Sequence, residues 1–305
     1  MAEERENGHT DPLKEGPAPV DPGRGTLELG VAARGDLRWA AVDVSGPLEE
    51  ARRRLDLSPL AAVALGRTLS AASLLLRFTT KNPGSLLVEV LGDGPLGKVL
   101  AEVNSEGHLR GTVGNPRVPT PEDGSLSLAP AIGQGLLRVT QEGERGRYTS
   151  HVELVTGEIG TDLAHYLEQS QQIRSAALLG VLPRPNGIAA AGGLLVEAFP
   201  GVPEETLSGL EHNIEELHGV SALLAQGGMP GLRDALLIGF DREDLEHHVL
   251  RYQCSCDRDR LRDGLETLGR QQLEEVMDPD GKCRAACAFC GNQYEFHIDD
   301  LTLAN

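Results

Sequence analysis

Short apolar segments alternate with turn residues through the first two thirds of the chain. Thr26–Val31 and Leu37–Val44 flank the turn Arg34-Gly35-Asp36, which predicts an antiparallel hairpin. Further strands are expected where apolar runs are bounded by Gly-, Asn- and Pro-rich turns. Together these strands predict an α+β fold whose core domain is a mainly antiparallel sheet with helices. The further strands are expected at Ser85–Leu91, Lys98–Val103, His108–Val113, Leu136–Gln141, Tyr148–Leu154 and Ile188–Phe199.

An Ala- and Leu-rich helix is predicted between the first strands. Ser58 can cap its N-terminus and Pro59 suits its first position, and the apolar pattern runs to about Phe78. Because the segment is apolar on most sides, we expect it to be buried between layers. Its apolar tract Ala61–Leu76 is too short and too polar to span a bilayer. Shorter helices are expected at Pro47–Leu55 and Asp162–Gln172.

The region after Pro200 changes to an amphipathic pattern. From Pro203 onward, leucines recur at three- and four-residue steps with glutamates opposite, which predicts a surface helix with one apolar face. The glycines of 219–231 interrupt the pattern, and Leu232–Ile238 is a further apolar stretch. The predicted regions are a disordered tail (1–25), a core domain (26–200), a helical linker domain packed on the core sheet (201–250) and a small C-terminal module (251–305).

The composition and net charge of the chain exclude some classes of binding partner. The chain has 305 residues, and 46 acidic against 28 basic residues give a formal net charge of −18. Such a charge repels nucleic acid and anionic lipid, so neither is an expected partner. The N-terminal tail is rich in Glu, Gly, Pro and Asp and has no basic-then-apolar signal pattern. A cytoplasmic location is therefore predicted.

Four of the five cysteines form two close pairs near the C-terminus. A C-x-C pair and a C-x-x-C pair are separated by thirty residues. Two such pairs can close a tetrahedron of thiolates, for which Zn²⁺ is the natural ion. A closed set of four sulfurs leaves no position for a catalytic water, so we predict one structural Zn²⁺ per chain in the reduced protein. The predicted metal ligands are Cys254, Cys256, Cys287 and Cys290.

Other side chains near these cysteines have weaker claims on the metal. His247, His248 and His297 are not needed, because four thiolates already complete the shell. Cys283 follows a turn-forming segment and is interpreted as a spare thiol. Two interpretations stay open for the charged residues that surround the site: Asp257–Arg260 form a solvated helix start, or three arginines partly neutralise the tetrathiolate. These arginines are Arg258, Arg260 and Arg284.

The segments around both cysteine pairs carry a family resemblance. Tyr252-Gln-Cys254-Ser-Cys256 and Cys287-Ala-Phe-Cys290-Gly-Asn-Gln-Tyr294 resemble the C-terminal module of the redox-regulated 33 kDa heat-shock chaperones, the 33 kDa chaperonin family. Gly92–Pro95, Ser170–Ile173 and Ala190–Gly193 resemble the family's landmarks in the same order. The resemblance covers roughly residues 25 to 300. The polar N-terminal stretch and Cys283 depart from the family pattern.

The resemblance implies an oxidation-activated holdase that works without ATP and is not an enzyme. In reducing conditions the module would hold the linker against the core, and oxidation with unfolding stress would free the linker to bind unfolding client proteins, with the chaperone as a homodimer. The close spacing allows disulfides Cys254–Cys256 and Cys287–Cys290 in the oxidised state. A module of about fifty residues is near the size at which a metal must replace missing core.

Two other classes of function compete with this interpretation. A zinc-stabilised nucleic-acid-binding protein would need a basic face, which the net charge disfavours. A thiol-disulfide oxidoreductase could use the C-x-x-C pair, but no thioredoxin-like βαβ pattern surrounds it. The glycines of Gly92–Lys98 mimic a phosphate loop, although no Ser or Thr follows the lysine and no helix is predicted there. No nucleophile, base and orienting residue form a recognisable catalytic set.

Overall fold

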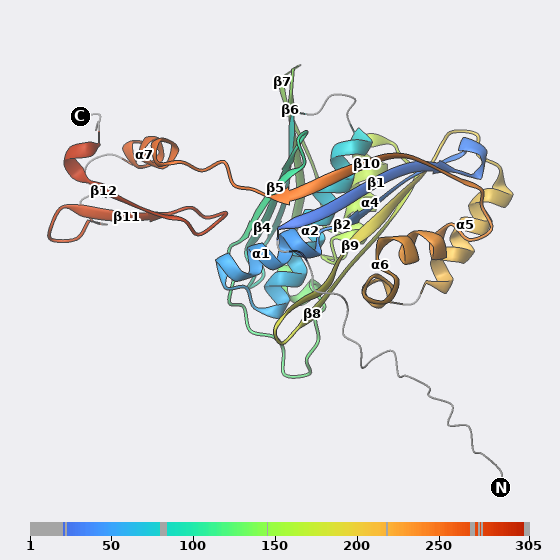
Figure 1. Ribbon diagram of the computed structural model, residues 1–305, viewed down its shortest axis with the longest axis horizontal. Coiled ribbons are helices and arrows are strands. Elements are labelled where there is room, and N and C mark those ends of the chain that lie inside the picture. Colours follow the sequence, from blue (N-terminus) through green and yellow to red (C-terminus); the bar gives the residue numbers. More distant parts are fainter. Residues whose placement is uncertain are drawn as a thin grey trace, which may run out of the picture.

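The computed structural model describes residues 21, 23–79, 84–144, 146–217, 219–268, 272, 273, 275 and 277–301. They form a ten-stranded sheet with helices on both faces and a separate two-stranded hairpin near the C-terminus (Figure 1). The α+β class and the mainly antiparallel sheet are as predicted from the sequence. Most of the predicted N-terminal tail lies outside the described residues, and the first strand begins inside it at Arg24.

The large sheet has the order β7-β6-β3-β4-β5-β10-β1-β2-β9-β8. All of its neighbours are antiparallel except β5 and β10, which are parallel and pair through two residues of each strand. The second sheet pairs β11 with β12. The strands are β1 (Arg24–Ala32), β2 (Leu37–Asp43), β3 (Ser85–Gly92), β4 (Lys98–Asn104), β5 (His108–Val113), β6 (Gly135–Gly143), β7 (Gly146–Glu153), β8 (Ser175–Arg184), β9 (Gly187–Ala198), β10 (Arg242–Tyr252), β11 (Lys282–Ala286) and β12 (Gln293–His297).

The helices follow the predicted apolar patterns with two differences. The helix from Glu204 ends at Glu216, before Gly219, as predicted, but Val220–Leu236 is a further helix that bends at Gly228, whose φ of 59° and ψ of −160° are not helical. The last part of the expected helical linker, from Arg242 onward, is strand β10 of the central sheet. The helices are α1 (Ser45–Leu55), α2 (Pro59–Thr79), α3 (Ala129–Ile132), α4 (Gly160–Gln171), α5 (Glu204–Glu216), α6 (Val220–Leu236) and α7 (Arg258–Glu266), with 3-10 turns η1 (Ala33–Gly35) and η2 (Ile298–Asp300).

Helix α2 is the centre of the main hydrophobic core. It packs against β3, β4 and β5 on one side and β8 and β9 on the other, so the sheet curls round it (Figure 1). Its stretch Pro59–Phe78 is long and apolar enough to cross a membrane, but 89% of that window is buried inside the protein. Thr68, Ser70 and Ser73 are fully buried and donate to the carbonyl four residues earlier, which satisfies their hydroxyls inside the core.

A second core lies on the opposite face of β1, β2 and β9, under α5 and α6. Trp39 on β2 is fully buried there, and Leu232 and Leu236 of α6 pack into the same cluster. These helices cover the sheet at the end away from the C-terminal hairpin (Figure 1). Of the apolar stripe predicted for α5, Leu210 is buried in this cluster and Ile214 and Leu217 are half-buried against it.

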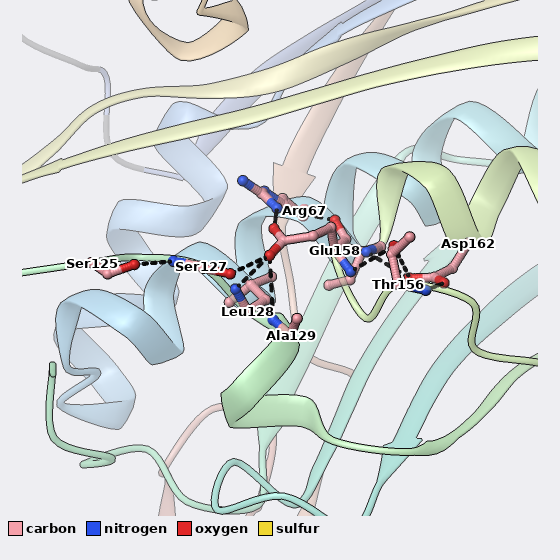
Figure 2. Close-up of polar contacts among 9 residues, drawn as sticks. Arg67, Ser125, Ser127, Leu128, Ala129, Thr156, Glu158 and Asp162 are labelled. Carbon is pink, nitrogen blue, oxygen red and sulfur yellow. Dashed lines mark hydrogen bonds and ion pairs between the residues drawn. The ribbon is translucent and has the colours of Figure 1, made fainter.

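Glu158 anchors the loop segment before α3, as Figure 2 shows. Its carboxylate accepts from Arg67 Nη1 at 2.6 Å and Ser127 Oγ at 2.6 Å, and from the backbone amides of Leu128 and Ala129 at 3.0 and 3.3 Å. Burial raises the pKa of the Glu158 carboxyl, but the hydrogen bonds from Ser127 and Arg67 outweigh it and hold the pKa below its ordinary value.

Backbone amides in the turn of Gly92–Lys98 already donate hydrogen bonds to other backbone carbonyls. The amide of Gly94 donates to the carbonyl of Ile132 at 2.8 Å, and the amide of Leu96 donates to the carbonyl of Ala131 at 3.0 Å. These amides are committed to the carbonyls of the last two residues of α3, so they cannot cradle a phosphate. The segment is the tight turn between β3 and β4 that the sequence favoured.

Candidate metal centre

The structure brings together the four cysteines singled out from the sequence. Their sulfur atoms all lie within 4.8 Å of one another. The sulfurs of Cys254 and Cys287 are 3.7 Å apart, and those of Cys256 and Cys290 are 3.3 Å apart. A tetrahedral ion with sulfurs at about 2.3 Å has edges of about 3.8 Å, so the cluster has the size that Zn²⁺ requires.

Two turns present these sulfurs. The C-x-C pair lies in the extended segment between β10 and α7, where the Asp257 carboxylate caps the helix by accepting from the amide of Arg260 at 2.8 Å. The C-x-x-C pair lies in the turn between β11 and β12. There the amide of Gly291 donates to the carbonyl of Cys287 at 2.8 Å, and Gly291 adopts a φ of +71°, which favours glycine. The two turns meet because α7 and the β11–β12 hairpin pack together.

The module around the cluster has a small apolar core. Its buried residues are Leu273, Cys283, Phe296 and Leu301, with a few half-buried neighbours. Cys283 is a member of this core on β11 and lies outside the group of four sulfurs. The predicted separation of Cys283 from the ligands thus agrees with its position, although it is buried rather than exposed.

Burial raises the pKa of the Cys254 thiol and raises that of Cys290 well above its ordinary value. Burial also raises the pKa of Cys256, but hydrogen bonds with the Tyr294 hydroxyl and the neighbouring sulfurs outweigh it and bring this pKa to about 7. Cys256 therefore deprotonates more readily than Cys254 or Cys290. Protonated thiols do not bind metal, so the cluster favours a cation strong enough to displace protons.

The arginines weighed from the sequence all belong to the module itself. Arg260 donates to the carbonyl and hydroxyl of Ser255 at 3.0 and 2.8 Å. Arg258 donates to the carbonyl of Glu295, and Arg284 is paired with the Glu295 carboxylate at 3.6 Å. All three bond to oxygen atoms, and Asp257 and Arg258 form the predicted helix start.

The arginine that contacts sulfur comes from the core sheet. Arg110 Nη1 on β5 lies 3.8 Å from the sulfur of Cys254. Sequence reasoning missed this residue because it lies 144 positions before the cysteine and has no local motif.

Two of the histidines considered as ligands, His248 and His297, have other partners, and His247 is exposed on β10. His248 Nε2 lies 2.7 Å from a carboxylate oxygen of Glu246, and His297 Nδ1 lies 3.2 Å from Asp299. The group of possible ligand atoms within the described residues contains the four cysteines and no histidine at this site. A closed four-sulfur shell is the arrangement of a structural ion rather than a hydrolytic one.

Comparison with known proteins fits this geometry. The sequence profile of the Hsp33 protein family matches residues 26–297, both cysteine pairs included. The chain belongs to the Hsp33 family. A 33 kDa chaperonin from Thermus thermophilus is 41% identical, covering 91% of this chain and 85% of that protein. One from Nostoc punctiforme is 40% identical, covering 88% of this chain and 92% of that protein.

The fold of a relative is similar as well. The crystal structure of the 33 kDa chaperonin from Thermotoga maritima matches with a TM-score of 0.80 at 33% sequence identity. The match covers 90% of this chain and 95% of that one. Hsp33 membership confirms the family resemblance read from the cysteine segments. It also makes this chain a molecular chaperone rather than an enzyme.

Proposed function

We propose that the reduced chain holds one Zn²⁺ through Cys254, Cys256, Cys287 and Cys290, and that oxidation of these cysteines activates it as a holdase. The observation that carries the proposal is the four-sulfur cluster in a module whose apolar core, among the residues that the structure describes, is one cluster of four buried side chains. A bound structural Zn²⁺ keeps its thiolate ligands deprotonated and can supply about 10 to 16 kcal/mol of folding free energy. So small a core makes the module depend on that contribution.

Oxidation would remove the metal ligands by converting pairs of thiolates into disulfides. Two thiolates, one hydrogen peroxide and two protons give one disulfide and two waters, with two electrons passing from sulfur to peroxide. We propose the pairs Cys254–Cys256 and Cys287–Cys290 as the products, because neighbours within each turn stay close when the module unfolds. Two disulfides in place of four thiolates leave no ligands for a metal, so the module loses the bonds that close it.

The linker helices α5 and α6 provide the apolar surface that activation would expose. Their buried leucines and the β1-β2-β9 face form a continuous second core that is separate from the core around α2. Displacing the helices would uncover both sides of this interface. A large exposed apolar surface binds unfolded chains without chemical energy. Unfolding client proteins are the proposed partners, with a homodimer as the active form and the cytoplasm as the compartment.

Two measurements before and after peroxide test the proposal at a mildly denaturing temperature. The reduced protein should carry about one zinc per chain and leave client aggregation unchanged. The oxidised protein should release the metal and suppress aggregation. Protein purified under reducing conditions without zinc would refute the metal assignment. Suppression of aggregation that is equal in both states would refute the redox switch.

Hydrogen exchange tests the order of events. Peroxide alone should remove amide protection from residues after about Arg251, and peroxide with mild heat should remove it from α5 and α6 while α2 stays protected. Simultaneous loss of protection in α2 would indicate global unfolding instead of a switch. Protected linker helices in a preparation that already binds clients would place the client surface elsewhere.

A further inference from the structure

Arg110 is a core residue held in a defined orientation. It lies on β5 directly opposite Glu102 of β4. Its Nε donates to the Glu102 carboxylate at 2.8 Å and its Nη2 lies 2.6 Å from the same oxygen. An arginine fixed by a carboxylate in this way presents its remaining N–H groups in one direction. That direction is toward the C-terminal module.

The same side chain contacts both cysteine turns. Its Nη1 lies 3.8 Å from the Cys254 sulfur and donates to the Ser255 hydroxyl at 3.2 Å. Its guanidinium stacks on the ring of Phe289, 4.5 Å from the centroid. Ser255 stands between the cysteines of the first pair and Phe289 between those of the second. One core cation thus spans the two turns that form the metal centre.

The charge that Arg110 faces depends on the redox state of the sulfurs. Four thiolates around a divalent cation carry a net charge of about −2, whereas two disulfides carry none. The Arg110 side chain is 21% exposed, so solvent screens its attraction to this charge only in part. Oxidation therefore removes the anion while leaving the arginine and its carboxylate partner in place on the sheet.

Other contacts between core and module lie near the cysteines, and the charged Arg54 guanidinium interacts electrostatically with Cys290. The Tyr252 hydroxyl donates to the carbonyl of Phe289. Gly291 lies so close to α1 that a Cβ there would stand 3.0 Å from the carbonyl oxygen of Arg54. The Arg54 guanidinium is paired with Glu50 and stacks on Tyr252, 5.5 Å from the ring centroid. Within the described residues, Arg110 is the arginine that donates to a cysteine sulfur.

We propose that Arg110 is a positioning residue that docks the C-terminal module on the core while the four sulfurs are anionic and releases it when oxidation neutralises them. This inference rests on the proposed zinc and redox function and names the core residue through which that function is sensed. Because Arg110 contacts the module but is not a metal ligand, we expect its loss to weaken docking of the reduced module without removing a ligand of the metal.

The test compares Arg110→Gln with Arg138→Gln. Arg138 on β6 forms the same kind of cross-strand pair, with its Nη2 donating to Glu89 Oε1 at 2.7 Å, and Glu89 is itself buried. Each variant leaves a carboxylate without its arginine on the same sheet, but of the two arginines it is Arg110 that contacts the module. The measurements are zinc content, hydrogen exchange of 108–113 and 251–256, and the rate of zinc release by peroxide.

Reduced Arg110→Gln should bind about one zinc, exchange in 108–113 and 251–256 about tenfold faster than wild type, and release zinc faster, whereas Arg138→Gln should match wild type at both segments. After full oxidation the wild type and Arg110→Gln should exchange equally. Arg110→Lys, which keeps the charge but not the fork, should recover part of the protection.

Two results would overturn the inference. One is equal exchange of reduced Arg110→Gln and Arg138→Gln at these segments. The other is a difference between Arg110→Gln and wild type that persists after oxidation, which would show a role in packing alone. Failure of the wild type to bind zinc or to respond to peroxide would instead contradict the proposed function, so the two failures are distinguishable.

Discussion

Truncation of a linker leucine should activate the chaperone without an oxidant. Leu232 of α6 is fully buried in the second core, where α6 packs against β8, β9 and β2. A buried Leu→Ala change costs about 3 kcal/mol or more, through lost transfer free energy and the cavity left behind. Because Leu232 packs at the interface between linker and sheet, we expect this loss to fall on docking of α6. A cost of about 3 kcal/mol shifts the docking equilibrium roughly a hundredfold.

Leu74→Ala in α2 is the matched control, since Leu74 is also fully buried but lies in the core around α2. Reduced Leu232→Ala should keep its zinc, lose amide protection in α5 and α6, and suppress client aggregation at a temperature where reduced wild type does not. Leu74→Ala should lower the unfolding temperature without this activity. The reasoning is refuted if Leu232→Ala exposes α6 to exchange yet still needs peroxide for client binding.

Three further predictions concern the metal and the core. Cys283→Ser should retain about one zinc per chain while Cys287→Ser loses it, and equal loss in both by metal analysis would mean that the ligands are assigned wrongly. A strong chelator under reducing conditions should abolish amide protection in β11 and β12 but not in α2, and protection that survives complete zinc removal would show a module stable without metal. Glu158→Gln should lower the free energy of unfolding at pH 7 by about 1 to 3 kcal/mol. Because the pKa of Glu158 lies below its ordinary 4.5, its contribution is present above pH 4.5 and lost as pH falls through the lowered pKa. Denaturant titrations should therefore show the difference between variant and wild type shrinking in acid, and a difference independent of pH would contradict the charged role.

The strands and helices that could be predicted are those with a local signal. The hairpin of β1 and β2 and the cap and apolar run of α2 follow from residue pattern alone, and the Ser58 hydroxyl does accept from the amide of Ala61 at 3.3 Å. Strand β10 has no such signal. Its first half is charged and exposed, and it is a strand because its backbone pairs with β1 from Arg242 to Arg251. Tertiary pairing overrides local propensity there.

The candidate site also has a part that the sequence pattern predicts and a part that depends on tertiary structure. The spacing of the cysteines predicts which four sulfurs form the cluster, because each turn contributes two closely spaced cysteines. Arg110 could not be predicted, because its contact with the metal centre depends on how β5 is placed beside the end of β10. Strand β8 was also missed. Its sequence is rich in Ala and Leu with few β-branched residues, and its pairing with β9 makes it a strand.

Strand β10 lies between the metal module and the linker helices and connects them along the chain. It pairs with β1 over most of its length, but with β5 only through Arg251 and Tyr252, at the end next to the cysteines. A module that leaves β5 therefore loosens β10 at the end where it has strand partners on both sides.

The other end of β10 contributes to the docking of α6. Arg233 of α6 is buried against Trp39, 5.5 Å from its ring centroid, and its charge is balanced by Glu28 of β1 at 2.6 Å and Asp244 of β10 at 3.7 Å. A buried arginine that loses a carboxylate partner is strongly destabilised. Displacement of β10 from β1 would thus weaken the ion pairs under α6 as well as the backbone ladder. We expect oxidation at the cysteines to reach the linker through this strand.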